Sequence, residues 1–154
     1  MAIYVDADAC PVKDEVLRVA ERHGITVYMV SNSWMRLPDH PLIQRIVVAE
    51  GPDAADDWIA ERVNKSDIAI TADIPLAHRC ITAGARVIRN DGKVLDTNNI
   101  GMILAMRDLM KDLRDAGTMQ TYNASFSKSN RSDFLQALET AVQAIKRAGS
   151  KEAQ

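Results

Sequence analysis

Short apolar runs alternate with amphipathic segments along the first 90 residues of the chain. Each run is rich in β-branched residues and ends in polar or acidic residues, which is typical of a buried parallel strand that opens into a loop. We predict strands at residues 2–5, 25–30, 43–48, 67–72 and 85–88. Between them, apolar residues at helical spacing predict helices at residues 12–23, after residues 51–52, and at residues 75–83. This alternation indicates an α/β fold, with a doubly wound parallel sheet of about five strands flanked by helices.

The remaining part of the chain has a different pattern. Residues 90–92 predict a turn, and residues 99–115 predict a helix that contributes apolar side chains to the core. Residues 117–130 are polar, contain no acidic residue and follow neither period, so we expect a flexible loop. A last amphipathic helix is predicted within residues 131–148, packed on the same domain. The expected organisation is one α/β domain at residues 1–116, followed by this loop and a C-terminal helical arm.

Composition narrows the class of protein. With 154 residues, of which 47% are hydrophobic and 26% charged, the chain can bury one core of ordinary size. The formal net charge of -2 argues against a strongly basic nucleic-acid coat protein, although it allows a local basic patch. No apolar run approaches the roughly 20 residues that cross a bilayer, and the first residues are acidic where a signal peptide is basic. The two cysteines, Cys10 and Cys80, suit a reducing compartment as free thiols, so we expect a cytoplasmic protein with no membrane partner.

Acidic residues follow the predicted strands at the points where those strands end. In an open parallel sheet, ligands bind outside the carboxyl ends of the strands, near the point where the strand order reverses. Three stretches bring carboxylates to this edge: Asp6 and Asp8 after the first strand, Asp53, Asp56 and Asp57 at a helix start, and Asp73 after the fourth strand. The second strand ends in the neutral oxygen donors Ser31 and Asn32. The sequence therefore predicts an oxygen-rich site along one edge of the sheet.

Carboxylates held this close repel one another unless some are protonated or a cation lies among them. Hard divalent ions prefer oxygen ligands, so we expect one or two Mg²⁺ or Mn²⁺ ions. The expected metal ligands come from Asp6, Asp53, Asp56, Asp57 and Asp73, and the expected catalytic residues are Asp6, Asp8, Asp56 and Asp73. The expected substrate contacts, chosen by location, are Lys13, Ser31, Asn32, Thr71 and Arg107. Metal-activated water attacking phosphorus in line would make the reaction phosphoester hydrolysis.

The same acidic residues also have purely structural interpretations. Acids at a helix start, such as Asp56 and Asp57, often only complement the helix dipole. Asp8 and Asp73 both suit N-cap positions. The coincidence of three acidic stretches at one edge favours the functional interpretation.

Other chemistries have weaker support in the sequence. The chain has neither a GxxxxGK[ST] phosphate loop nor a GxGxxG after a strand, which disfavours a nucleoside triphosphatase or a dinucleotide oxidoreductase. The three histidines are scattered and lack zinc-ligand spacing. The pair Asp6 and Asp8 also fits a phosphatase in which Asp6 is the nucleophile. A non-catalytic RNA- or protein-binding module that keeps the acidic edge is a further alternative.

Four runs of sequence resemble the bacterial YaiI/YqxD family: VDADACPVK at residues 5–13, EGPDAADDWIAERV at 50–63, DIAITADIPLAHRCITAGARVI at 67–88 and AMRDLMKDLR at 105–114. That family is similar to the PIN-like superfamily, in particular to its NYN branch of metal-dependent ribonucleases with a Rossmann-like sheet. The resemblance implies ligand roles for Asp6, at the end of the first strand, and for Asp73. It leaves the ligand from the second helix open, because Asp53, Asp56 and Asp57 lie close together in the sequence.

The resemblance and the acidic edge together predict a metal-dependent ribonuclease. A shallow acidic site suits single-stranded RNA better than a duplex. The acid-free loop and the residues next to it carry Tyr122, Phe126, Lys128 and Arg131, which could clamp a strand by stacking and charge.

Overall fold

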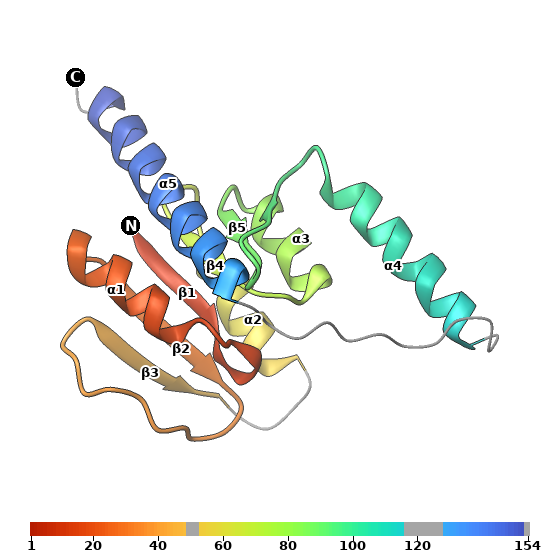
Figure 1. Cartoon of the computed structure of the whole chain (residues 1–154), viewed down its shortest axis with the longest axis horizontal. Coiled ribbons are helices and arrows are strands. Elements are labelled where there is room, and N and C mark those ends of the chain that lie inside the picture. Colours follow the sequence, from red (N-terminus) through yellow and green to blue (C-terminus); the bar gives the residue numbers. More distant parts are fainter. Residues whose placement is uncertain (49–52, 116–127, 153–154) are drawn as a thin grey trace.

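The computed structural model describes residues 1–48, 53–115 and 128–152, and it places helices on both faces of one six-stranded sheet (Figure 1). The strands are β1 (Ala2–Asp6), β2 (Thr26–Ser31), β3 (Ile43–Val47), β4 (Ile68–Ile70), β5 (Arg86–Ile88) and β6 (Val94–Leu95). The helices are α1 (Lys13–His23), α2 (Ala54–Ala60), α3 (Ile74–Thr82), α4 (Ile100–Asp115) and α5 (Lys128–Glu152), with a short 3-10 helix η1 (Ala7–Ala9) after β1.

The strand order is β3-β2-β1-β4-β5-β6, and the first five of these strands run parallel. The predicted α/β class and the five predicted strands are confirmed. From β1 the chain builds outward through β2 to β3, and then returns through α2 to β4 on the other side of β1. The strand order therefore reverses between β1 and β4, which is where ligands bind in sheets of this kind.

The hydrophobic pattern of the sequence does not predict the sixth strand. β6 pairs antiparallel with β5 after the turn at residues 90–92, where the Arg89 N–H donates to the Lys93 carbonyl at 2.8 Å. Gly92 adopts a φ of 90° in this turn, a conformation open to glycine at little cost. A strand of two residues is too short to give an alternating pattern, so only its turn could be predicted.

The two faces of the sheet bury separate clusters of apolar side chains. Ile3 and Val5 of β1 face α1 and α5, whereas Tyr4 faces α2 and α3. All three side chains are buried, as expected for a central strand covered on both sides. Asp6 continues the alternation of β1, so it lies on the side of α2 and α3.

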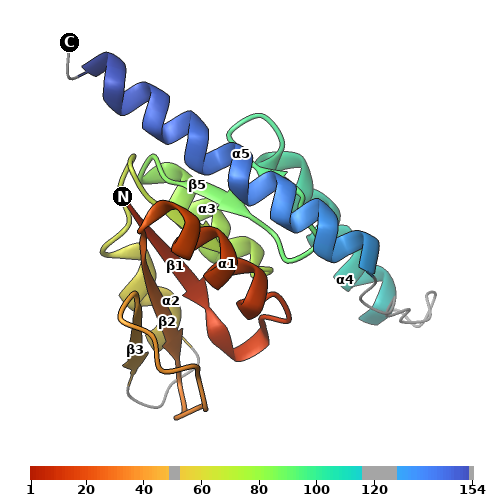
Figure 2. The same ribbon diagram turned by 60° about the vertical axis from the view of Figure 1, so that its left-hand side comes forward.

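Helix α5 completes the layer that contains α1. Its side chains Phe134, Leu138 and Val142 are fully buried, and Glu139 accepts hydrogen bonds from Arg22 and pairs with His23 at the end of α1. Figure 2 shows α5 crossing the molecule beside α1. Since this long helix fills one face of the sheet, it belongs to the core of the fold.

The beginning of α5 corrects one prediction. Residues 128–130 were expected in the polar loop, but they form the first turn of the helix. Their polar side chains hide the helix start because this turn lies before the first buried position, Phe134. The rest of the predicted loop, including Tyr122 and Phe126, lies outside the described residues.

The prediction that α4 is core-facing is only partly correct. Ile100 is buried, and Ile103 and Leu104 pack against the cluster around α3. Met102 and Leu109 are 73% and 50% exposed. Figure 1 shows that α4 extends away from the sheet, and its contacts with the cluster around α3 come from Ile100, Ile103 and Leu104 near its start.

The two cysteines and the helices bear on the predicted free thiols and on the predicted absence of a membrane span. Cys10 and Cys80 are both free and buried, in agreement with the expectation of free thiols. Among the described residues, no helix combines the length and apolar character that crossing a bilayer requires.

Candidate active site

The candidate site lies at the carboxyl ends of β1 and β4, where the strand order reverses. The register pairs Val5 with Ile70, so the next residues, Asp6 and Thr71, lie side by side. The Thr71 hydroxyl donates a hydrogen bond to Asp6 Oδ2 at 3.1 Å. The same hydroxyl oxygen accepts a hydrogen bond from the Asp73 N–H at 3.0 Å. Buried Thr71 therefore links the two strand-end aspartates, although the sequence placed it among the substrate contacts.

Asp73 is the N-cap residue of α3. Its Oδ1 accepts a hydrogen bond from the Leu76 N–H at 2.9 Å, and Pro75 occupies the first turn of the helix. This cap holds the carboxylate in place at the end of β4. Because a carboxylate has two oxygens, the cap and a role in ligand binding are compatible.

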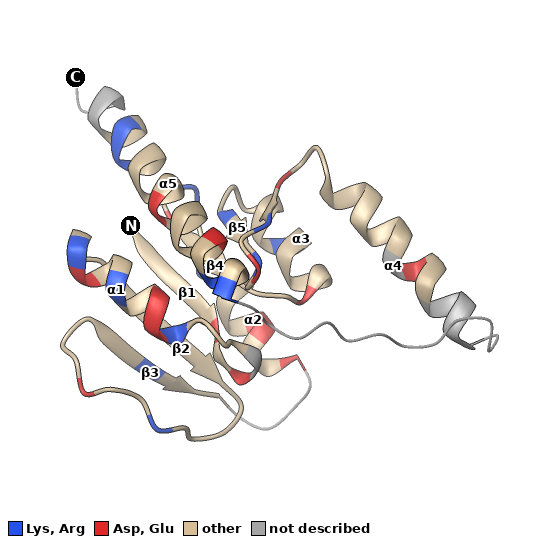
Figure 3. Cartoon of the chain, in the orientation of Figure 1, with Lys and Arg blue, Asp and Glu red and all other residues tan. Residues whose placement is uncertain are grey.

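Asp56 brings a third carboxylate from α2. Burial raises the pKa of Asp56 to about 6, with further contributions from the negative charges of Asp73, Asp6 and Asp53. Burial also raises the pKa of Asp6; the Thr71 hydrogen bond opposes this effect, and the charges of Asp73 and Asp8 add to it. The carboxylates of Asp6, Asp56 and Asp73 thus share one region of negative potential, which we call the carboxylate cluster. In Figure 3, acidic positions on α2 and after β1 lie toward the same end of the sheet.

Three other predicted aspartates lie around this cluster in different environments. Asp57 pairs with Arg79 of α3 at 2.7 Å, and both side chains are about half exposed. Asp8 accepts a hydrogen bond from the Asn32 N–H at 3.0 Å, which ties the loop after β2 to η1. Asp53 is exposed at the N-cap position of α2, where its side chain makes no capping hydrogen bond. The sequence could not reveal the role of Arg79, because its partner Asp57 is 22 residues away.

Two of the remaining predicted substrate contacts, Ser31 and Lys13, serve local structure. Ser31 is buried, and its hydroxyl donates to the Ser33 carbonyl at 2.7 Å. Lys13 donates to the Cys10 carbonyl at 3.0 Å. Asn32 has a buried side-chain oxygen without a hydrogen-bond partner. Arg107 is part of α4, but its side chain lies outside what the structure describes.

The donor chemistry of the carboxylate cluster fits a hard divalent cation, although the present rotamers do not form a finished site. Within residues 1–48, 53–115 and 128–152, no three Asp, Glu, His or Cys side chains are arranged to hold a metal ion as they stand. The ligand types nevertheless suit Mg²⁺ or Mn²⁺, because every candidate is a carboxylate oxygen. The main charge that opposes the repulsion at Asp56 is the exposed Arg79. A cation bound among Asp6, Asp56 and Asp73 would offset this repulsion.

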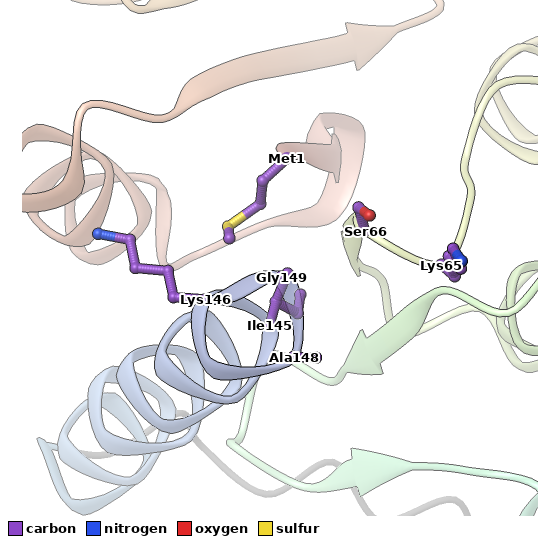
Figure 4. Close-up of a pocket in the computed structure, with 7 residues that line it drawn as sticks. All are labelled: Met1, Lys65, Ser66, Ile145, Lys146, Ala148 and Gly149. Carbon is purple, nitrogen blue, oxygen red and sulfur yellow. The ribbon is translucent and has the colours of Figure 1, made fainter. Parts of the chain in front are cut away.

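A separate hollow of about 350 Å³ lies at the opposite edge of the sheet (Figure 4). Met1 and Ser66, which precede β1 and β4, line it together with Lys65 and the last turns of α5. Lys146, also in its lining, lies 2.8 Å from His23 Nδ1 through its Nζ atom. This hollow does not contact the carboxylate cluster, because it adjoins the amino ends of the strands.

Comparisons with known proteins identify relatives along nearly the whole chain. A family model described as "Uncharacterized BCR, YaiI/YqxD family" matches residues 4–144. A UPF0178 protein of Nitrobacter winogradskyi is 59% identical over 146 residues, which cover 95% of this chain and 93% of the relative. A UPF0178 protein of Parvibaculum lavamentivorans is 58% identical, covering 94% of this chain and 95% of the relative. No solved structure matches the chain.

Proposed function

We propose that this chain, which belongs to the YaiI/YqxD family, is a metal-dependent phosphodiesterase that hydrolyses RNA. One observation carries the proposal. Asp6, Asp56 and Asp73 come from three separate elements and repel one another at the point where the strand order reverses. The repulsion between these carboxylates lowers the stability of the fold unless a positive charge is bound among them, which is typical of a functional site.

The proposed ligands of Mg²⁺ or Mn²⁺ are Asp6, Asp56 and Asp73. When bound, the ion supplies Lewis acidity and lowers the pKa of a coordinated water, so that hydroxide is available near neutral pH. Thr71 orients Asp6 through its hydroxyl, and the α3 cap holds Asp73. Asp8 positions the loop after β2 through Asn32. In this proposal the carboxylates would hold the ion, whose positive charge would attract the substrate phosphate, and no covalent intermediate forms on the protein.

The loop after β2 favours RNA over a small phosphate ester as the substrate. Trp34 in this loop is 67% exposed, and the Arg45 guanidinium lies 5.0 Å from the centre of its ring. Exposed aromatic rings with a neighbouring arginine stack on unpaired bases in proteins that bind single strands. The loop begins at Asn32, which is hydrogen-bonded to Asp8 beside the cluster. An extended substrate is therefore able to contact both the loop and the cluster.

The experiment that tests the proposal is hydrolysis of labelled single-stranded RNAs by the purified protein with Mn²⁺, Mg²⁺ or EDTA. The test variants are Asp6→Asn and Asp73→Asn, which keep side-chain size; the asparagine oxygen at position 73 can still accept the Leu76 N–H. The matched control is Asp57→Asn, because Asp57 is paired with Arg79. We expect metal-dependent cleavage that falls at least about a hundredfold in both test variants and persists in the control.

Other outcomes would separate the alternatives. Cleavage that EDTA leaves intact, or that Asp6→Asn leaves unchanged, would refute the proposal. Hydrolysis of small phosphate esters with trapping of beryllofluoride at Asp6 would instead assign a phosphatase with an aspartate nucleophile. RNA binding without turnover at any metal concentration would assign a binding module.

A further inference from the structure

The outer face of α4 is an uncharged surface that the described part of the chain leaves open. Residues 99–106 (NIGMILAM) contain no charged side chain, and Gly101, Met102, Ala105, Met106 and Leu109 are all exposed. These positions share one side of the helix at spacings of one, three and four residues. A helix face toward water normally carries polar and charged residues. We call these five positions the α4 outer face.

The opposite side of α4 is already used. Ile100, Ile103 and Leu104 belong to the apolar cluster around α3. The first turns of α4 are therefore apolar on both sides, which is the pattern of a helix covered on both sides. The exposed fractions of 73% for Met102, 46% for Met106 and 50% for Leu109 show that residues 1–48, 53–115 and 128–152 do not supply the second cover.

A hollow next to the α4 outer face offers a seat for an apolar side chain. Its volume is about 340 Å³. It is lined by Ile74 at the start of α3, by Met102, Ile103, Met106 and Met110 of α4, and by one charged residue, Arg89. Methionine side chains adapt readily to a partner because they are unbranched and polarisable. Leu109, which is 50% exposed, lies on the same helix that borders this hollow, and the hollow is large enough to accept a leucine side chain.

We propose that the α4 outer face is the interface of a two-fold symmetric homodimer, in which α4 packs antiparallel against α4 of a second copy. A two-fold interface joins one patch to the same patch on the partner. Leu109 of each copy can therefore enter the hollow of the other copy, so the same contact forms twice. If the axis passes Met106, Leu109 of each copy lies opposite Ile103 of the other, beside the hollow.

Charge also favours a second copy over other occupants. The five positions of the α4 outer face carry no charge, and the hollow beside them has one charged lining residue, Arg89, so this surface offers little electrostatic attraction to nucleic acid or to a strongly charged peptide. The charged positions between and after these residues, Arg107, Asp108, Lys111 and Asp112, alternate in sign and cancel. Residues 116–127 (AGTMQTYNASFS) are mostly polar and lack the apolar periodicity of a covering helix.

The first test is the mass of the full-length protein by sedimentation velocity over concentrations from about 1 to 100 μM, the range in which helix-pair dimers of modest area dissociate. We expect a dimer that Met106→Glu and Leu109→Lys weaken at least about tenfold, since each places a charge in the centre of the contact. Val47→Lys is the matched control, because Val47 is 48% exposed on the edge strand β3. Far-UV circular dichroism of each variant checks that the fold is retained.

The second test places a thiol at the proposed axis. Met106→Cys is expected to form a disulfide between two copies under mild oxidation, since a two-fold axis brings the two thiols together. Cys10 and Cys80 are buried and do not compete, and Val47→Cys is the control. A monomer at every concentration, or a dimer unaffected by Met106→Glu, would overturn the proposal. A dimer that Met106→Glu disrupts but Met106→Cys never crosslinks would overturn the antiparallel arrangement.

Discussion

Replacement of Asp56 by asparagine should stabilise the protein at neutral pH. The pKa of Asp56 rises from 3.8 to about 6 on folding, chiefly because of burial and then because of Asp73, Asp6 and Asp53. Since each pKa unit corresponds to 1.36 kcal/mol, the charged form destabilises the fold by about 3 kcal/mol before solvent screening. The side chain is only half-buried, so we expect about 1 kcal/mol to persist. For a domain of this size, about 1 kcal/mol raises the melting temperature by roughly 2 to 4 °C.

The stabilisation expected from Asp56→Asn depends on pH. Below the unfolded pKa, Asp56 is protonated in both states and the charge has no effect on the free energy of unfolding. As the pH rises from about 4 to about 6, the unfolded state ionises first and the fold loses stability, and above the folded pKa the full destabilisation is present. Asparagine does not ionise, so the variant does not lose this stability. Its free energy of unfolding should exceed that of the wild type at pH 7.5 and nearly equal it at pH 4.

The assay is thermal unfolding by circular dichroism in EDTA, at about pH 4 and pH 7.5, the two sides of the transition. The control is Asp57→Asn, on the same helix, which removes a half-exposed ion pair with Arg79 and should cost at most about 1 kcal/mol. An Asp56→Asn variant that melts below the wild type at pH 7.5 would refute the reasoning. So would a stabilisation of equal size at both pH values.

Three further predictions concern the fold. Asp67→Ala should lower the free energy of unfolding by about 2 to 3 kcal/mol in urea titrations, because buried Asp67 accepts hydrogen bonds from two backbone N–H groups; no loss would contradict this. Gly92→Ala should destabilise the protein by more than Gly24→Ala, because the added Cβ would lie 2.7 Å from the Asp133 carbonyl carbon, whereas Gly24 has open space; equal losses in thermal melts would refute this. Phe134→Ala should cost about 3 to 5 kcal/mol by chemical denaturation, and a loss below about 1 kcal/mol would show that α5 is not part of the core.

The strand ends were predictable from the sequence because each depends on local pattern. A buried β-branched run followed by an acid indicates a strand and places its end to within one or two residues, which is why Asp6 and Asp73 were expected at one edge. The five parallel strands followed from the same alternation. Helix α3 was predictable because Pro75 and Gly84 bracket an apolar segment.

Features that depend on distant partners were not predictable. Asp56 and Asp57 are neighbours in one helix, and the sequence alone does not say which faces the cluster. That choice follows from the position of Arg79 on α3, which pairs with Asp57. Thr71 resembled a substrate contact until the strand register placed its hydroxyl against Asp6. The exposed side of α4 was not predictable, because the spacing of apolar residues shows which side of a helix is apolar but not what packs against that side.

The position of α5 in the core has a consequence for protein synthesis. Phe134 and Leu138 fill the face of the sheet that also holds α1, and the contact between Arg22 and Glu139 spans 117 residues. At about 5 to 20 residues per second, the ribosome needs roughly 6 to 22 seconds after completing α1 to reach Phe134. During this interval the apolar side of β1 and α1 has no cover. A nascent chain stalled before α5 should therefore bind chaperones, and the emergence of α5 from the ribosome allows this face of the sheet to be covered.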